Sequence, residues 1–211
     1  MLRSPWIPVL VVSFRTEGAQ KMEVDFFNLS GGYGAGDVFS TTGPYAGSVA
    51  LPVPVKDTYH LNISGSGRWT AETAPLVTTS PLKVPVNLSG TGTQVTPVFY
   101  LERGEYFFER NVTGENSPYF FLWYANGTPL MDANNTYIQP AFGALSPRPF
   151  SIISIPENGT YFLNVLGRYN PGSWAVSITP VPKIQLGPGP EIYQSPGNES
   201  SRSPAAGSGA S

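Results

Sequence analysis

The stretch GTYFLNVLGRYNPGSWAVSI, residues 159–178, decides the fold, because another part of the chain follows the same pattern. Residues 57–74, DTYHLNISGSGRWTAETA, also run Thr-Tyr-x-Leu-Asn, then an apolar residue, a glycine-containing turn and a single tryptophan. Alternating residues on both sides of a turn predict a β-hairpin. The chain therefore contains two copies of one hairpin, in which Tyr59 matches Tyr161 and Trp69 matches Trp174.

The repeat extends upstream of both hairpins, in the same order. VVSFRTEG resembles YFFERNVTG, VDFFNLSG resembles FLWYANG, and GPYAGSVALPV takes the place of FGALSPRPFSIISIP; these are residues 11–18 and 106–114, 24–31 and 121–127, and 43–53 and 142–156. A repeat of this length is a whole domain and not a solenoid unit. Short alternating segments separated by turn signals predict an all-β chain with two tandem antiparallel β-sandwich domains, jelly-roll or immunoglobulin-like.

The repeat also predicts the domain limits. We expect the first sandwich at residues 1–74, a Pro/Thr linker at 75–84, the second sandwich at 85–181 and a disordered Pro/Gly/Ser-rich tail at 182–211. The first unit has fewer residues before its VVSF strand than the second has before Tyr106, so it lacks an opening strand. Two explanations stay open: the natural chain starts earlier, or a donor strand from elsewhere completes the sandwich.

Residue composition supports β structure and restricts the partners. Only 12% of the 211 residues are charged, Gly and Pro supply 23 and 22 residues, and aromatic residues make up 13%. The formal net charge of −2 argues against nucleic-acid binding, which needs a basic face. No segment reaches the ~20 apolar residues of a membrane-spanning helix. Cysteine is absent, which excludes disulfides and thiolate metal sites.

Alternation within the hairpins predicts the core. Tyr161, Leu163 and Val165 share one strand face, and Phe162 and Asn164 share the other. Tyr59, Leu61 and Ile63 form the equivalent set. The two hairpin tryptophans are then explained by core packing, and an exposed, sugar-stacking tryptophan is the alternative.

The sequence context of the asparagines indicates the cellular compartment. Of 12 asparagines, 8 lie in Asn-x-Ser/Thr sequons, an excess over the roughly one in eight that ordinary Ser and Thr frequencies give. This excess predicts a glycosylated extracellular or cell-surface protein, with glycans on loops and strand ends. Accidental sequons in a Ser/Thr-rich chain are the alternative. The sequon asparagines are Asn28, Asn62, Asn87, Asn111, Asn126, Asn134, Asn158 and Asn198.

Several motifs together resemble a known family of modules. These are Gly104-x-Tyr106-x-Phe108, an aromatic strand that ends at Asn126-Gly127, Ile155-Pro-x-x-Gly-x-Tyr-x-Leu-x-Val165, and Trp174-x-Val-x-Ile178. The chain is similar to the pre-peptidase C-terminal type β-sandwich modules of secreted bacterial and archaeal proteins. The likeness covers residues 85–180 and a truncated copy at about 8–74. It implies a module without catalytic residues; some such modules bind calcium, but no ligand set matches here.

No residue pattern predicts catalysis, a metal site or a cofactor. The one histidine, His60, is expected on the solvent face of its strand, and no Gly-x-Ser-x-Gly elbow nominates a serine nucleophile. The carboxylate pairs Glu23/Asp25 and Glu102/Glu105 are explained by a solvated edge and a turn. Asp132-Ala-Asn-Asn does not fit the spacing of a calcium loop. GGYGAG, residues 31–36, is expected to be a loop between strands.

These observations predict a non-enzymatic, glycosylated module with a structural, spacer or adhesion role. Its expected partners are cell-envelope proteins or polysaccharide. A carbohydrate-binding module and an accessory domain of a secreted hydrolase are the alternatives. Sugar rings stack on exposed aromatic side chains, and the candidates near loops and strand ends are Trp123, Tyr124, Tyr169 and Tyr45.

Overall fold

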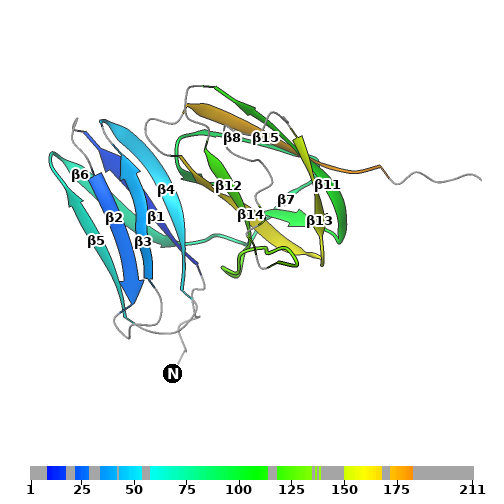
Figure 1. The fold of residues 1–211 in the computed structure, drawn as a ribbon, viewed down its shortest axis with the longest axis horizontal. Coiled ribbons are helices and arrows are strands. Elements are labelled where there is room, and N and C mark those ends of the chain that lie inside the picture. The colour runs from blue at the N-terminus through cyan, green and yellow to red at the C-terminus, as the bar shows by residue number, and fades with distance from the viewer. Residues whose placement is uncertain are drawn as a thin grey trace, which may run out of the picture. The chain divides into compact units, whose positions relative to one another are not determined.

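The computed structural model describes residues 9–17, 22–28, 34–41, 43–53, 58–113, 118–134, 136, 138, 150–167 and 172–182; for residues 27–28 and 34–41 it describes the backbone alone. This part of the chain holds fifteen β-strands and no helix, which confirms the all-β class (Figure 1). The strands are β1 (Val9–Thr16), β2 (Met22–Asn28), β3 (Gly34–Thr41), β4 (Tyr45–Pro52), β5 (Tyr59–Gly65), β6 (Trp69–Pro75), β7 (Leu82–Lys83), β8 (Val86–Thr91), β9 (Gln94–Val95), β10 (Phe99–Leu101), β11 (Gly104–Val112), β12 (Tyr119–Tyr124), β13 (Phe150–Ile155), β14 (Gly159–Leu166) and β15 (Ser173–Pro180).

The strands form four sheets, two from each half of the chain. In the first half, β1–β6, the sheet orders are β4-β1-β6 and β3-β2-β5. In the second half, β7–β15, they are β13-β11-β15-β8 and β12-β14-β10-β7, and β9 also pairs with β14. All of these pairs are antiparallel except β7 with β10.

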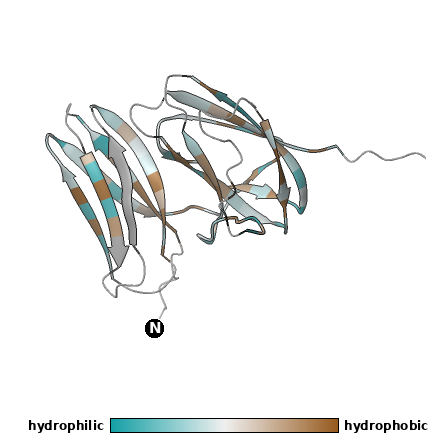
Figure 2. Ribbon diagram, viewed as in Figure 1, coloured by the Kyte–Doolittle hydropathy of each residue, from teal (hydrophilic) through white to brown (hydrophobic). Residues whose placement is uncertain are grey.

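Period-2 alternation explains why these segments are strands with one buried face. On β2, Met22, Val24 and Phe26 are buried, while Glu23 and Asp25 between them are partly exposed. Successive side chains of a strand point to opposite faces, so one apolar set packs inward. Figure 2 shows this as hydrophobic and hydrophilic positions that alternate along β2.

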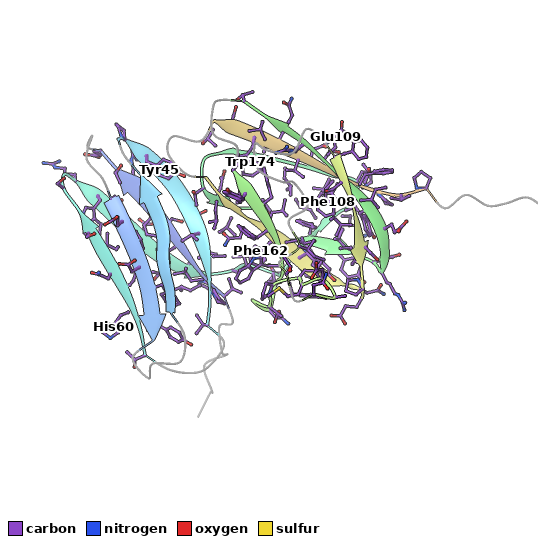
Figure 3. All side chains as sticks on the ribbon, viewed as in Figure 1. Tyr45, His60, Phe108, Glu109, Phe162 and Trp174 are labelled. Carbon is purple, nitrogen blue, oxygen red and sulfur yellow. The ribbon has the colours of Figure 1, made fainter. Side chains whose placement is uncertain are left out.

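Each half has its own apolar cluster. In the second half, sixteen buried residues pack together, among them Phe108, Tyr161, Leu163 and Trp174 (Figure 3). Trp174 is 3% exposed, which confirms its predicted place in the core. In the first half, the cluster has seven buried residues, and Tyr59, Leu61 and Ile63 are only partly buried against it.

The two halves share one pairing register. Trp69 lies opposite Thr16 on β1, and Trp174 lies opposite Val112 on β11. Tyr59 lies opposite Asn28 on β2, and Tyr161 lies opposite Tyr124 on β12. In both comparisons, the partner residue of the second half lies the same number of positions further along the chain than the partner residue of the first half. Strands β1, β2, β4, β5 and β6 therefore correspond to β11, β12, β13, β14 and β15.

The second face of β14 is also buried. Phe162 belongs to a third cluster with Val9 and Ala50 of the first half and Val98 and Trp123 of the second. Residues Met1–Val181 accordingly group as one compact unit. The finer limits at residues 74 and 85 stay a prediction, and the expected tail lies outside the described residues apart from its first residue.

Two sequence expectations are wrong. Gly34 begins strand β3, so the glycine-rich loop does not extend to residue 36 as expected. Trp69 is 41% exposed, although its partner in the repeat is a core residue. Among the described residues no strand pairs with the outer edge of β6, and this leaves the ring uncovered.

Candidate functional site

The residues that could support catalysis are scattered, and each is partly or fully exposed. His60 lies on the exposed face of β5, as expected (Figure 3). Glu102 and Glu105 are exposed on either side of the turn at Arg103. Within the described ranges, no group of three or more His, Cys, Asp or Glu side chains could hold a metal ion.

The carboxylate of Asp132 accepts hydrogen bonds from the backbone of its own loop. Asp132 Oδ1 accepts hydrogen bonds from the backbone N–H groups of Asn134 at 2.8 Å and Thr136 at 2.9 Å. Aspartate commonly stabilises a turn by bonding the backbone two residues on. This oxygen therefore closes the loop.

The candidate sugar-stacking residues have different surroundings. Trp123 is 9% exposed and packs against Phe162, with ring centroids 6.2 Å apart, so little of its ring is open to a ligand. Its indole Nε1 is buried and has no hydrogen-bond partner in the described part of the chain. Tyr124 is partly buried against Tyr161, with centroids 4.8 Å apart. Tyr169 lies outside the described residues.

Tyr45, the fourth candidate, holds the two halves together. Its hydroxyl accepts a hydrogen bond from the backbone N–H of Thr93 and lies 3.4 Å from the Thr93 carbonyl oxygen. Burial raises the pKa of the Tyr45 phenol, and its hydrogen bonds with Thr93 oppose that rise. Tyr45 is therefore a structural residue of β4, and its hydrogen bonds with Thr93 explain its position without a bound sugar.

Further hydrogen bonds join β4 to the second half. Ser48 N–H donates to Thr93 O at 3.0 Å, and Val95 N–H donates to Ser48 Oγ at 3.0 Å. Asn164 Oδ1 accepts from Ala50 N–H at 3.2 Å, and Asn164 Nδ2 donates to Ala50 O at 3.4 Å. We call these contacts the β4 joint. Sequence reasoning missed the joint, because nothing local marks Asn164 as a buried bonding group.

A tyrosine cluster closes one end of the second core. Tyr161 OH donates to the Glu157 carbonyl at 2.9 Å, and Tyr106 OH accepts from Glu102 N–H at 3.0 Å. Burial raises the pKa of Tyr161 well above its ordinary value, and neighbouring Tyr124 and Glu157 raise it further. The hydroxyls here satisfy backbone groups of two turns, which is a structural role.

The sequon asparagines whose side chains the structure describes are all exposed. Asn62 is on β5, Asn87 on β8 and Asn111 on β11, each on the face away from its core, and the others lie in turns. Asn126 Oδ1 accepts from Thr128 N–H at 2.9 Å, and Asn158 Oδ1 accepts from Arg103 N–H at 2.7 Å. These contacts use the side-chain oxygen and not the nitrogen. The exposed sequon asparagines are Asn62, Asn87, Asn111, Asn126, Asn134 and Asn158.

An apolar strip on β13 and β11 is a second feature that sequence reasoning missed. Phe150 and Ile152 are each 50% exposed on β13, and Phe107 lies opposite Ile152 on β11. The rings of Phe107 and Phe150 meet edge to face at 6.2 Å. The carboxylates of Glu105 and Glu109 share this face, and Glu109 is labelled in Figure 3. FSIISI predicts a strand, but not which of its two apolar-containing faces is outside.

The clearest difference between the halves is an open strand edge. In the second half, β8 covers β15, and β9 and β10 cover β14. Among the described residues of the first half, no strand pairs with the corresponding edges of β6 and β5. Trp69, Tyr59, Leu61 and Ile63 are consequently more exposed than their buried counterparts. The lack of a pairing strand at these edges, among the described residues, explains this exposure.

Comparisons with known proteins give no family for this chain. No family model matches the chain, and no curated protein matches it. Among solved structures, the chain is similar to Aeromonas hydrophila PliG, a periplasmic inhibitor of g-type lysozyme. The match has 17% sequence identity and a TM-score of 0.27, and it covers 47% of this chain and 96% of that one. No helix long and apolar enough to cross a membrane occurs in the described residues.

Proposed function

We propose that this chain is a glycosylated, non-enzymatic module of the cell surface that acts as a spacer or adhesive building block. The observation that carries this proposal is the exposure of all six sequon asparagines whose side chains are described. The described asparagine outside a sequon, Asn164, is buried. Glycosylation needs an accessible Asn side chain on the surface, so the accessible asparagines are the ones that carry the motif.

The side-chain nitrogens also suit this role. N-linked glycans attach to the amide nitrogen of asparagine. In Asn126 and Asn158 the amide oxygen accepts a backbone hydrogen bond, and this bond does not use the amide nitrogen. Attachment at these sites would preserve both hydrogen bonds.

The architecture we propose is two tandem β-sandwich domains, the first without its opening strand. The shared pairing register and the separate apolar cluster of each half support it. This arrangement agrees with the resemblance to pre-peptidase C-terminal type modules, which also serve as accessory parts of larger secreted proteins. No described residue cluster favours the carbohydrate-binding alternative over the spacer role.

Glycopeptide mass spectrometry on the protein isolated from its native cells tests the proposal. We expect glycan masses on peptides that contain several of the six exposed sequons, and no glycan attached to Asn164 itself. Unmodified peptides at all six positions would contradict a glycosylated surface module. Enzymatic turnover that co-purifies with the chain, and is lost on a core substitution, would contradict the non-enzymatic part.

A further inference from the structure

No described strand pairs with the outer edge of β6, which corresponds to an occupied edge in the second half. There, β8 pairs antiparallel with β15, and Gly90 lies opposite Trp174. Val86 and Leu88 of β8 point inward and are buried in the core cluster. The second half therefore shows which kind of segment covers this edge.

The contact with Trp174 is close and specific. A Cβ atom on Gly90 would lie 2.5 Å from Trp174 Cζ2, so a side chain at this position would collide with the indole ring. The indole Nε1 donates to the Gly92 carbonyl at 3.0 Å. A strand and its following turn thus cover Trp174 and satisfy its N–H.

The matching surface of the first half is uncharged. Trp69, Ala71 and Thr73 face the core side of β6, because they lie opposite Thr16, Phe14 and Val12, which are buried. Residues directly opposite each other in an antiparallel pair share a sheet face. A segment of alternating apolar residues therefore fits this edge better than a charged one.

We propose that the β6 edge of the first half is a docking site for an extended, uncharged segment of a partner polypeptide. The segment adds antiparallel to β6, places alternate apolar side chains against the first core, and has a glycine opposite Trp69. Exposed strand edges recruit strands in this way, with backbone hydrogen bonds for affinity and side-chain pockets for specificity. The proposal goes beyond glycosylation and holds with or without it.

A peptide with the sequence of residues 84–95, VPVNLSGTGTQV, is the probe, labelled with fluorescein for anisotropy. We expect saturable binding to the full chain at peptide concentrations below about 1 mM, with a blue shift of tryptophan emission as Trp69 is covered. The Trp69→Phe variant should still bind but lose the shift. These two results together place the peptide at β6 and not at β15.

Two matched controls sharpen the test. Thr73→Lys puts a charge on the core side of β6, whereas Thr70→Lys puts the same charge on the opposite, exposed face, and both native threonines are exposed. We expect Thr73→Lys to weaken binding at least about tenfold and Thr70→Lys to leave it within about twofold. A peptide that carries Val in place of Gly90 should bind at least about tenfold more weakly than the native sequence.

Three results would overturn the proposal. The first is no binding of the native peptide at about 1 mM. The second is equal binding by the two lysine variants, which would place the peptide elsewhere. The third is a dimer of the full chain in light scattering that Thr73→Lys dissociates, because the edge would then be filled by a second copy and not by a partner.

Discussion

Asn164 and Asn62 occupy equivalent strand positions but meet different surroundings. Asn164 is buried and bonds both backbone groups of Ala50 in the β4 joint. Asn62 is exposed on β5 and belongs to a sequon. The same residue type is thus a structural group in one half and a candidate attachment site in the other.

Replacing Asn164 tests its structural role. Asn164→Ala leaves the Ala50 N–H and C=O buried without partners, so we expect a loss of about 2–4 kcal/mol in the free energy of unfolding. Asn62→Ala is the matched control and should change it by less than about 0.5 kcal/mol. Urea denaturation of both variants measures the difference, and similar losses in both would contradict the joint.

The two hairpin tryptophans provide a second matched pair. Trp174→Ala removes a ring that is 3% exposed and should cost about 3–5 kcal/mol of unfolding free energy. Trp69→Ala removes a ring that is 41% exposed and should cost less than about 2 kcal/mol. Chemical denaturation of the two variants checks the order. A larger cost at Trp69 would mean that its edge is already covered.

The buried phenol of Tyr161 gives a pH prediction. Its pKa is raised by burial, so the folded state favours the protonated phenol. Its contribution to stability is complete below the unfolded pKa of about 10 and declines as the pH rises above that value. Above about pH 10 the free energy of unfolding falls as the pH rises, and we expect Tyr161→Phe to make this fall less steep. Urea denaturation midpoints across this pH range measure it. An unchanged slope would contradict burial of this hydroxyl.

At the scale of elements, β4 is the strand that connects the halves. A Cβ atom on Gly47 would lie 2.5 Å from the Thr93 carbonyl oxygen and 2.6 Å from the Tyr45 ring. A side chain there must push β4 away from the turn at Thr93, and this displaces the Ser48 bonds as well.

Gly47→Val should therefore cost about 1–3 kcal/mol in unfolding free energy and weaken the contact between the halves. Ala46→Val, at the neighbouring exposed position, is the control and should be nearly neutral. Differential scanning calorimetry reports both. Equal melting temperatures for the two variants would contradict close packing at Gly47.

Local alternation was enough to predict most strands and the Trp174 core position. Period 2 is a property of neighbouring residues, so it can be seen in TYFLNV or FSIISI without any partner. It could not predict that Phe162 and Asn164 would be buried as well, since another part of the chain covers that face. The same limit explains Trp69, because no described strand pairs with the outer edge of β6 and covers the ring.

At the scale of the whole molecule, the sequon motif predicted exposed positions, whereas the aromatic candidates for sugar stacking could not be placed from the sequence. The sequon motif predicts surface positions, and the six sequon asparagines whose side chains are described are exposed. Aromatic residues gave no such guidance. Trp123 and Tyr124 are adjacent in sequence, yet one is buried and the other only partly buried, according to the strand face each occupies.

Hydrogen–deuterium exchange on the unglycosylated full chain tests most directly whether the first half has two open strand edges. Amides that no strand covers exchange through local opening at low free energy. We predict markedly faster exchange in β5 and β6 than in β14 and β15, and slowing of β6 alone when the 84–95 peptide is added. Equal protection of the matched strands before any peptide is added would contradict the open edges.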